Sequence, residues 1–187
     1  MTAEVDLRRV DAFAKRAHHG QTRNTGDDTA PEVPYIVHPR AVRRLLASHP
    51  NPAVRAPWVQ AVGLLHDVLE DCDVSRDELR AAFGEPIEHA VWLLSKELKT
   101  QPGSRRDDYW EALAAAPLAV RQVKAADRID NLRSCLKWHR VRLATKYLVE
   151  TPRKVLPLVV EDAHLYATLA RLLARVREAY PEVGRKP

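Results

Sequence analysis

Apolar residues recur three and four positions apart along most of this chain, which is the spacing of one face of an α-helix. In the first such stretch, Val10, Phe13 and Ala17 predict a helix over about residues 3–19. The same pattern predicts further helices over about residues 39–48, 57–71, 76–83, 86–97, 106–115, 118–138, 143–151 and 161–180. We therefore expect an all-α fold, a bundle of about eight to ten helices.

One long segment interrupts the helical pattern. Residues 20–35, GQTRNTGDDTAPEVPY, are rich in Gly, Asn, Asp and Pro and show no periodicity, so they predict a loop. A loop of this length in a compact domain commonly carries function. Because no repeat, low-complexity segment or linker divides the chain, residues 1–187 are expected to form a single domain.

Composition narrows the class of protein. Hydrophobic residues make up 45% and charged residues 29% of the chain, as in soluble globular proteins, and no apolar run is long enough for a membrane span. The net charge of +5 favours an anionic ligand such as a nucleotide, but Lys and Arg are spread over every segment, which argues against nucleic-acid binding. Cys72 and Cys135 lack CxxC spacing, and no signal peptide is recognisable, so we expect a cytoplasmic protein with reduced thiols.

The densest chemical feature is HDVLED at residues 66–71, where four ionisable groups stand in an otherwise apolar stretch. On one continuous helix, residues four apart share a face, which would place His66 over Glu70 and Asp67 over Asp71. The flanking Leu and Val residues carry these groups into a partly desolvated region, where a bound cation offsets unpaired charge. The alternative interpretation of so short a run is a solvated helix face with one stray histidine.

A metal site needs more donors than one short segment supplies, and two suitable groups stand elsewhere in the chain. His38 lies at the start of a predicted helix, just before Pro39. Asp127 lies in the strongly periodic stretch 118–138, where it shares a helix face with Asn131. Two imidazoles and two carboxylates suit one divalent transition metal. The complete candidate ligand set is His38, His66, Asp67 and Asp127.

Five segments also resemble, in order, the motifs of a known family. They are AHHGQTR (17–23), PYIVHP (34–39), LLHDVLED (64–71), FGEPI (83–87) and KAADRIDNLRS (124–134). Over about residues 10–138 the chain thus resembles the HD-domain phosphohydrolases, and among them the RelA/SpoT-type alarmone hydrolases, including the small single-domain ones. Five ordered motifs are far more specific than one His-Asp pair. The resemblance implies an all-helical HD-type bundle, and the helices over about 142–181 have no counterpart among these motifs.

The resemblance also implies a role for each matching residue. The four candidate ligands would bind one metal ion, usually manganese, which lowers the pKa of a bound water and polarises a phosphoryl oxygen. Glu70 and Asp71 would orient or deprotonate the attacking water. Arg23, Asn131 and Ser134 would contact the nucleotide, although Asn131 is equally interpretable as an ordinary amide on a helix face.

Some positions depart from the alarmone-hydrolase pattern, and all of them are on the substrate side. The stretch after Arg23 is longer than in the family, with an apparent insertion over residues 24–33. Asn24 replaces a basic residue, Asp130 stands where His is common, and Ser134 stands where Thr is common. The insertion adds acidic groups that would repel phosphate if they faced the pocket, namely Asp27, Asp28 and Glu32. The metal ligand set is unaffected.

Two other residues in or near the motifs have weaker assignments. His18 is interpreted as a residue that supports the site and not as a metal ligand. Lys96 is interpreted either as a substrate-facing residue or as a solvated lysine at a helix end. The remaining histidines read as surface or packing residues, namely His19, His49, His89, His139 and His164.

Three functions compete at this stage. The first is a metal-dependent hydrolase that removes the 3′-diphosphate from guanosine tetra- or pentaphosphate and yields GDP or GTP with pyrophosphate. The second is an HD-type phosphohydrolase for a different nucleotide or phosphate ester, which the insertion and Asn24 motivate. The third is a non-catalytic nucleotide-sensing or interaction module, against which the presence of both Glu70 and Asp71 counts.

Overall fold

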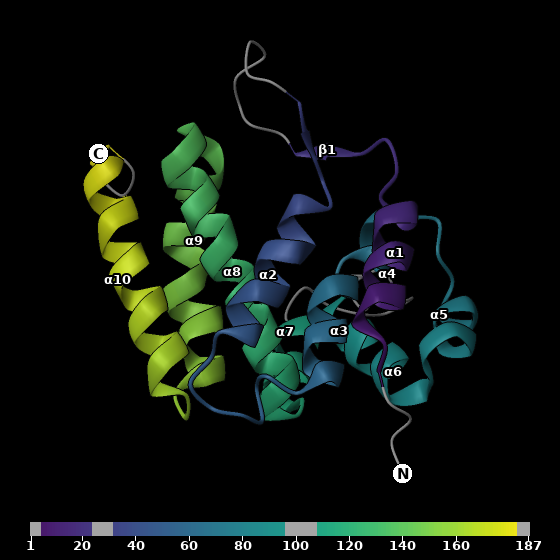
Figure 1. Cartoon of the computed structure of the whole chain (residues 1–187). Helices are drawn as coiled ribbons and strands as arrows, with labels where there is room; N and C mark the ends of the chain where they lie inside the picture. The colour runs from purple at the N-terminus through teal and green to yellow at the C-terminus, as the bar shows by residue number, and fades with distance from the viewer. Residues whose placement is uncertain (1–4, 24–31, 96–107, 183–187) are drawn as a thin grey trace.

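The long helix α8 runs through the middle of the molecule, and the other helices gather around it (Figure 1). The structure, a computed structural model, describes residues 5–23, 32–95 and 108–182. The helices are α1 (Leu7–Ala17), α2 (Val37–Ala47), α3 (Pro57–Leu65), α4 (Val68–Asp71), α5 (Arg76–Phe83), α6 (Glu85–Leu94), α7 (Asp108–Ala115), α8 (Leu118–Trp138), α9 (Val141–Glu150) and α10 (Ala163–Ala179). The predicted all-α fold is confirmed.

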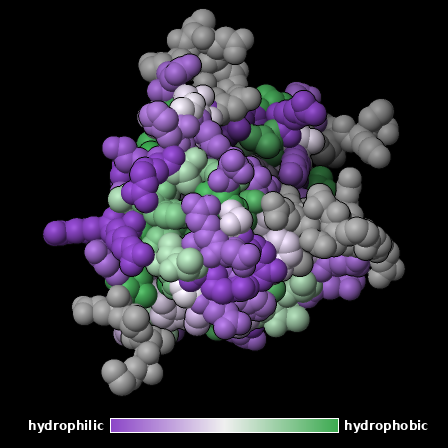
Figure 2. Space-filling view, turned by 90° about the vertical axis from the view of Figure 1, so that its right-hand side faces the viewer, coloured by the Kyte–Doolittle hydropathy of each residue, from purple (hydrophilic) through white to green (hydrophobic). Residues whose placement is uncertain are grey.

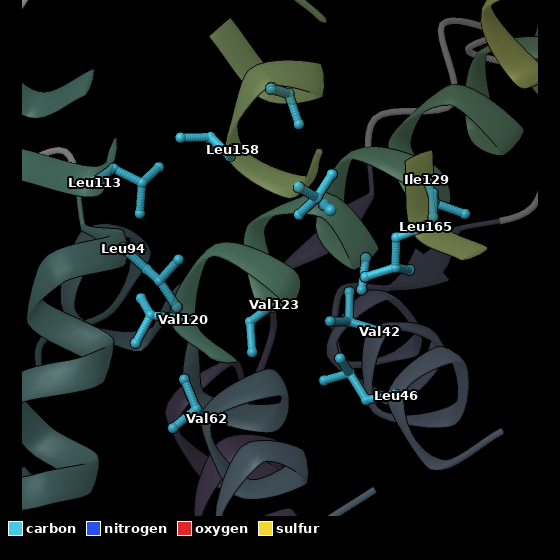
Figure 3. Packing of buried hydrophobic residues seen from close by; sticks show 14 of the residues in the cluster. Val42, Leu46, Val62, Leu94, Leu113, Val120, Val123, Ile129, Leu158 and Leu165 are labelled. Carbon is cyan, nitrogen blue, oxygen red and sulfur yellow. The ribbon is translucent and has the colours of Figure 1, made fainter. Parts of the chain in front are cut away.

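Helix α8 is buried along most of its length because it packs against α2, α3, α6, α9 and α10. Pro117 precedes its first turn, and His139 ends it in the left-handed conformation, with φ of 46°. Figure 3 shows Val120 and Val123 of α8 beside Leu94 of α6 and Val62 of α3. Buried polar residues on such a helix need partners inside the protein, so the buried Lys124, Asp127 and Ser134 of α8 indicate a candidate site.

The predicted helix over residues 57–71 is interrupted, so the expectation of one continuous helix was wrong. Helix α3 ends at Leu65 and α4 begins at Val68, with a turn at His66 and Asp67. His66 Nδ1 lies 2.9 Å from the carbonyl oxygen of Gly63. In a continuous α-helix that carbonyl would accept from the backbone N–H of Asp67, so the imidazole competes with the helix at this point.

Gly63 also allows α3 to approach α2 closely. A Cβ atom at this position would lie 2.6 Å from Cδ1 of Leu46, closer than carbon atoms pack. The side chain of Leu46 is 1% exposed and has little space into which to move. The close approach brings the start of α2, with His38, next to the end of α3, with His66.

The segment predicted as a loop over residues 20–35 contains a short hairpin, which the sequence did not indicate. Strands β1 (Thr22–Arg23) and β2 (Val33–Pro34) pair antiparallel, and the backbone N–H of Tyr35 donates to the carbonyl of Gln21 at 2.9 Å. Two-residue strands are too short to show alternation. The candidate residues Asn24, Asp27, Asp28 and Lys96 lie outside the described residues, whereas Glu32 is described and exposed.

The C-terminal helices continue the bundle and do not form a separate unit. Helices α9 and α10 match the two predicted C-terminal helices and are joined by a π-helical turn (Thr151–Val155) and a 3₁₀ turn (Leu156–Val159). Pro152 and Pro157 are the second residues of these turns, and each lacks the N–H that a continuing α-helix needs. Both α9 and α10 contact α8. The segment without a family motif therefore contributes to the same core.

The surface is mostly polar because the apolar face of each helix is turned toward the core. On the side that Figure 2 shows, hydrophilic residues cover most of the surface, with smaller apolar areas between them. Among the described helices, none combines the length and the apolar character that crossing a membrane requires.

Candidate metal centre and active site

The four predicted ligands come together from three parts of the fold. His38 is in the first turn of α2, His66 and Asp67 form the turn between α3 and α4, and Asp127 is on α8. His38 Nε2 lies 3.2 Å from Asp127 Oδ1 and 3.5 Å from Asp67 Oδ2. His66 Nε2 lies 3.0 Å from Asp67 Oδ2 and 3.8 Å from Asp127 Oδ1. Both imidazoles are almost fully buried.

The hydrogen bonds of the two imidazoles fit a metal in the space between them. His38 Nδ1 lies 2.7 Å from Asp130 Oδ2, and His66 Nδ1 lies 2.9 Å from the Gly63 carbonyl oxygen. Since both partners are acceptors, each Nδ1 donates its proton to them, which leaves Nε2 of each ring directed toward the carboxylates of Asp67 and Asp127, where it can hold either a proton or a metal ion. Within the described residues His66 Nε2 has no hydrogen-bond partner with suitable geometry. Lone pairs and carboxylate oxygens converge here, and a cation satisfies all of them.

The electrostatics of the cluster support the same conclusion. Burial lowers the pKa of His66, but the Asp67 carboxylate outweighs burial and raises that pKa to about 9. Burial raises the pKa of Asp67, but the nearby His66 outweighs burial and lowers that pKa below its usual range, so this carboxyl stays ionised. Burial likewise raises the pKa of Asp127, whereas Lys124, with Nζ 2.8 Å from Asp127 Oδ2, brings it well below its usual range. The cluster thus favours positive charge between its carboxylates.

Tyr35 is a site residue that the sequence analysis did not single out. Its hydroxyl lies 2.6 Å from Asp67 Oδ2 and 3.0 Å from Asp71 Oδ2, so its one proton is shared between two carboxylates. Burial and the nearby Asp67 raise the pKa of Tyr35, which keeps the phenol protonated as a donor. The residue lies in the PYIVHP segment, so the motif contained a signal for it.

His18 lies behind this tyrosine and not among the ligands. Its ring centroid is 4.7 Å from that of Tyr35, and its Nδ1 faces Gln21 Oε1 at 2.8 Å and Cys72 Sγ at 3.2 Å. Burial lowers the pKa of His18. A neutral ring packed against Tyr35 can support the site without touching it.

Glu70 and Asp71 border the cavity that opens in front of the ligands. Both are in the short helix α4, directly after the Asp67 turn, and line the same cavity as His38, Asp67 and Asp127. The break between α3 and α4 therefore changes their geometry but leaves them beside the metal ligands. Their position suits the handling of a proton on a water next to the metal position.

The three residues predicted to contact nucleotide meet one another on the other side of the cavity. Arg23 Nη2 donates to Ser134 Oγ at 2.8 Å and to Asn131 Oδ1 at 3.3 Å. Asn131 in turn donates through Nδ2 to Asp127 Oδ1. Arg23 and Asn131 line the cavity, whereas the hydroxyl of Ser134 is directed at Arg23. The amide of Asn131 therefore links the arginine to a predicted metal ligand.

Helix α9 supplies a further wall of the cavity that no motif indicated. It contributes Lys146 and Tyr147, and Arg140 precedes its first residue. In the part of the chain that the structure describes, neither Arg140 nor Lys146 has a carboxylate within ion-pair distance. Burial lowers the pKa of Arg140, and the nearby guanidinium of Arg23 lowers it further. Arg23 and Arg140, two like charges near one cavity, would both be stabilised by an anionic ligand bound between them.

Comparison with known proteins agrees with this site. The family model of the HD domain matches residues 12–171. A guanosine-3′,5′-bis(diphosphate) 3′-pyrophosphohydrolase of Vibrio cholerae is 38% identical over 134 residues, which cover 68% of this chain and 18% of that protein. A protein of the same name from Aquifex aeolicus is 32% identical over 132 residues, covering 69% of this chain and 18% of its own length. The chain thus spans about a fifth of the length of these curated relatives.

One solved structure is similar to this chain over nearly the whole length of both. It is described as a metazoan ortholog of SpoT that hydrolyses ppGpp, and it has 27% sequence identity and a TM-score of 0.73. The similarity covers 90% of this chain and 93% of that one. The chain belongs to the HD-domain family. Within that family it resembles the RelA/SpoT-type hydrolases, as its five motifs predicted.

Proposed function

We propose that this protein is a metal-dependent hydrolase that removes the 3′-diphosphate from guanosine tetra- or pentaphosphate. The observation that carries the proposal is the convergence of two imidazole Nε2 atoms and two carboxylates beside Glu70 and Asp71. Arg23 and Asn131 line the other side of the same cavity, and we call these two residues the substrate wall. The names of the relatives, and the ppGpp hydrolysis ascribed to the similar solved structure, support the choice of substrate.

The proposed cofactor is one divalent cation, with Mn²⁺ as the preferred ion. His38, His66, Asp67 and Asp127 would hold it, because a mixed set of imidazoles and carboxylates suits first-row metals, and manganese also favours oxygen donors. When bound, such a cation lowers the pKa of a bound water and offsets charge on a phosphoryl oxygen.

The remaining chemistry belongs to the side chains of the chain. Glu70 and Asp71 would accept the proton of the attacking water, with Asp71 held in place by the Tyr35 hydroxyl. The water oxygen forms a bond to the phosphorus attached to the ribose 3′-oxygen. The bond between that phosphorus and the 3′-oxygen breaks, and the 3′-oxygen takes up a proton. The products are GDP or GTP and pyrophosphate.

The substrate wall would neutralise the phosphates that are not attacked. Ser134 and Asn131 accept from Nη2 and so orient Arg23, whose Nη1 would then donate to a phosphate or whose plane would stack on the base. Arg140 and Lys146 add positive charge from a second direction. A nucleotide with phosphates at both the 5′ and 3′ positions places anions in both directions.

We propose further that residues 1–187 act as one domain, because α9 completes the cavity and α10 packs on α8. We also assign the protein to the cytoplasm, since both of its cysteines, Cys72 and Cys135, are free thiols, as expected in a reducing compartment.

A panel of nucleotides tests the assignment. Metal-stripped protein is reloaded with Mn²⁺ and incubated with guanosine tetraphosphate, GTP, GDP and a generic phosphate ester, and the products are separated by ion-exchange chromatography. Release of pyrophosphate and GDP in equal amounts from guanosine tetraphosphate alone is the expected result. Turnover of another compound in its place, or the absence of any turnover with metal bound, would overturn the assignment.

A further inference from the structure

Asp130 lies between His38, a proposed metal ligand, and Arg23, a residue of the substrate wall. Its Oδ2 atom lies 2.7 Å from His38 Nδ1 and 3.5 Å from Arg23 Nη2. Its side chain is only 17% exposed. The same oxygen atom therefore faces the first turn of α2 and the end of β1.

The register of α8 explains how this contact arises. Asp127 and Asp130 are three residues apart, so their side chains lie one above the other on adjacent turns. Asp127 faces His38 Nε2 at 3.2 Å, and Asp130 faces His38 Nδ1 at 2.7 Å. Side chains of one helix thus contact both nitrogens of the His38 imidazole, which fixes the rotation of the ring; with a metal ion at Nε2, the proton would stay on Nδ1.

The two imidazoles of the site are consequently held in different ways. His66 Nδ1 donates to a neutral backbone carbonyl, that of Gly63. His38 Nδ1 donates to a carboxylate, which increases the electron density at Nε2 and makes this ring the stronger metal donor. The guanidinium of Arg23 offsets part of the negative charge that Asp130 adds to a site already containing two carboxylates.

We propose that Asp130 is a positioning residue that fixes His38 as a metal ligand in this protein. The inference rests on the proposed metal-binding function but not on the identity of the substrate. The family resemblance leads to the expectation of His at this position, so Asp130 is one of the departures from the family pattern. A neutral histidine could accept one hydrogen bond but would offer neither His38 nor Arg23 an opposite charge.

The test is the affinity for Mn²⁺ of the metal-stripped full-length protein, measured by calorimetry without nucleotide. Asp130→Asn keeps an oxygen that can accept from Nδ1 but removes the charge, and we expect it to weaken Mn²⁺ binding roughly 10- to 100-fold. Asp130→Ala should weaken it at least as much. Asp77→Asn removes the same charge from an exposed residue that does not line the cavity, and it should bind Mn²⁺ like the wild type.

Two further readouts separate positioning from a general loss of structure. The metal-stripped Asp130→Asn protein should stay folded and melt in one cooperative transition close to the wild-type temperature, because asparagine keeps an oxygen that accepts from His38 Nδ1. In the unsubstituted protein loaded with diamagnetic Zn²⁺, long-range ¹H–¹⁵N NMR should show His38 with its proton on Nδ1, a measurement that needs no variant. Mn²⁺ affinity within twofold of wild type in both Asp130 variants, or an Nε2–H tautomer of His38, would overturn the inference.

The outcome is distinguishable from failure of the proposed function. If Mn²⁺ binds tightly and depends on Asp130 but no alarmone is hydrolysed, the substrate assignment fails and the inference stands. If alarmone is hydrolysed and the Asp130 variants bind Mn²⁺ normally, the inference alone fails.

Discussion

Arg23 Nη2 and Ser134 Oγ are 2.8 Å apart, although 111 positions separate these residues in the chain. The contact is buried and joins the short hairpin to the central helix α8. Ser134 therefore acts on the substrate side by orienting a guanidinium. The hydroxyl of Ser134 contributes the free energy of one hydrogen bond to a charged group.

Ser134→Ala should raise KM for guanosine tetraphosphate with little change in kcat. The loss of the hydroxyl leaves Arg23 less well oriented, and we expect a change of roughly fivefold, or about 1 kcal/mol. Steady-state kinetics at saturating Mn²⁺ measure it. Ser134→Thr retains the hydroxyl and serves as the matched control. An unchanged KM in Ser134→Ala would show that Arg23 is held without this contact.

Glu70→Gln should separate metal binding from catalysis. Glutamine keeps the size of the side chain but cannot accept the proton of the attacking water, so the rate should fall at least about 100-fold. Mn²⁺ content, measured by elemental analysis, should stay at one ion per chain. Asp67→Ala is the opposite case and should lose both metal and activity. Full activity in Glu70→Gln would exclude this residue from proton transfer.

Much of this architecture could be predicted from the sequence. Helical periodicity located the helices around α8, and the clustering of ionisable groups in HDVLED, with His38 and Asp127 at helix positions, indicated a metal site. These features depend on local spacing, which a sequence displays directly. The five motifs added the roles of the neighbouring residues.

Other features depend on contacts that local spacing does not display. The break between α3 and α4 follows from the bond of His66 to the Gly63 carbonyl. Strands β1 and β2 are each only two residues long, and the cations of α9 reach the cavity through the packing of α9 on α8. The pairing of Asp130 with His38 joins residues 92 positions apart. Such relationships appear only once the chain is folded.

Gly63→Ala should destabilise the protein by about 1–3 kcal/mol, because the added methyl would overlap Leu46 Cδ1 in a filled core. Thermal melting followed by circular dichroism measures the loss. Leu46→Val removes the overlapping methyl carbon, so the double variant should lose less stability than the sum of the two single variants. Strict additivity would contradict the steric explanation.

Stability at acid pH should depend on Glu88. This residue is completely buried on α6 and accepts from the guanidinium groups of Arg76 and Arg80 on α5. Burial raises the pKa of Glu88, but the two arginines outweigh burial and lower it. Since the pKa is lower in the folded than in the unfolded protein, the stabilisation is present above the unfolded value of about 4.3 and is lost as the pH falls through the folded value.

Glu88→Gln should therefore cost about 2 kcal/mol at neutral pH and flatten the decline of melting temperature below about pH 4.3. Melting curves of both proteins between neutral and acidic pH provide the measurement. Glu178→Gln, at an exposed position of α10, is the control and should behave as wild type. Equal acid sensitivity of Glu88→Gln and wild type would show that this ion cluster does not contribute.

The central claim is that four side chains from α2, the α3–α4 turn and α8 bind one divalent metal. Anomalous diffraction at the manganese absorption edge, from crystals of the full-length protein grown with Mn²⁺, tests it most directly. We predict one strong anomalous-difference peak per chain, within coordination distance of His38 Nε2, His66 Nε2 and the carboxylates of Asp67 and Asp127. No peak at this position, or a peak held by other residues, would contradict the account.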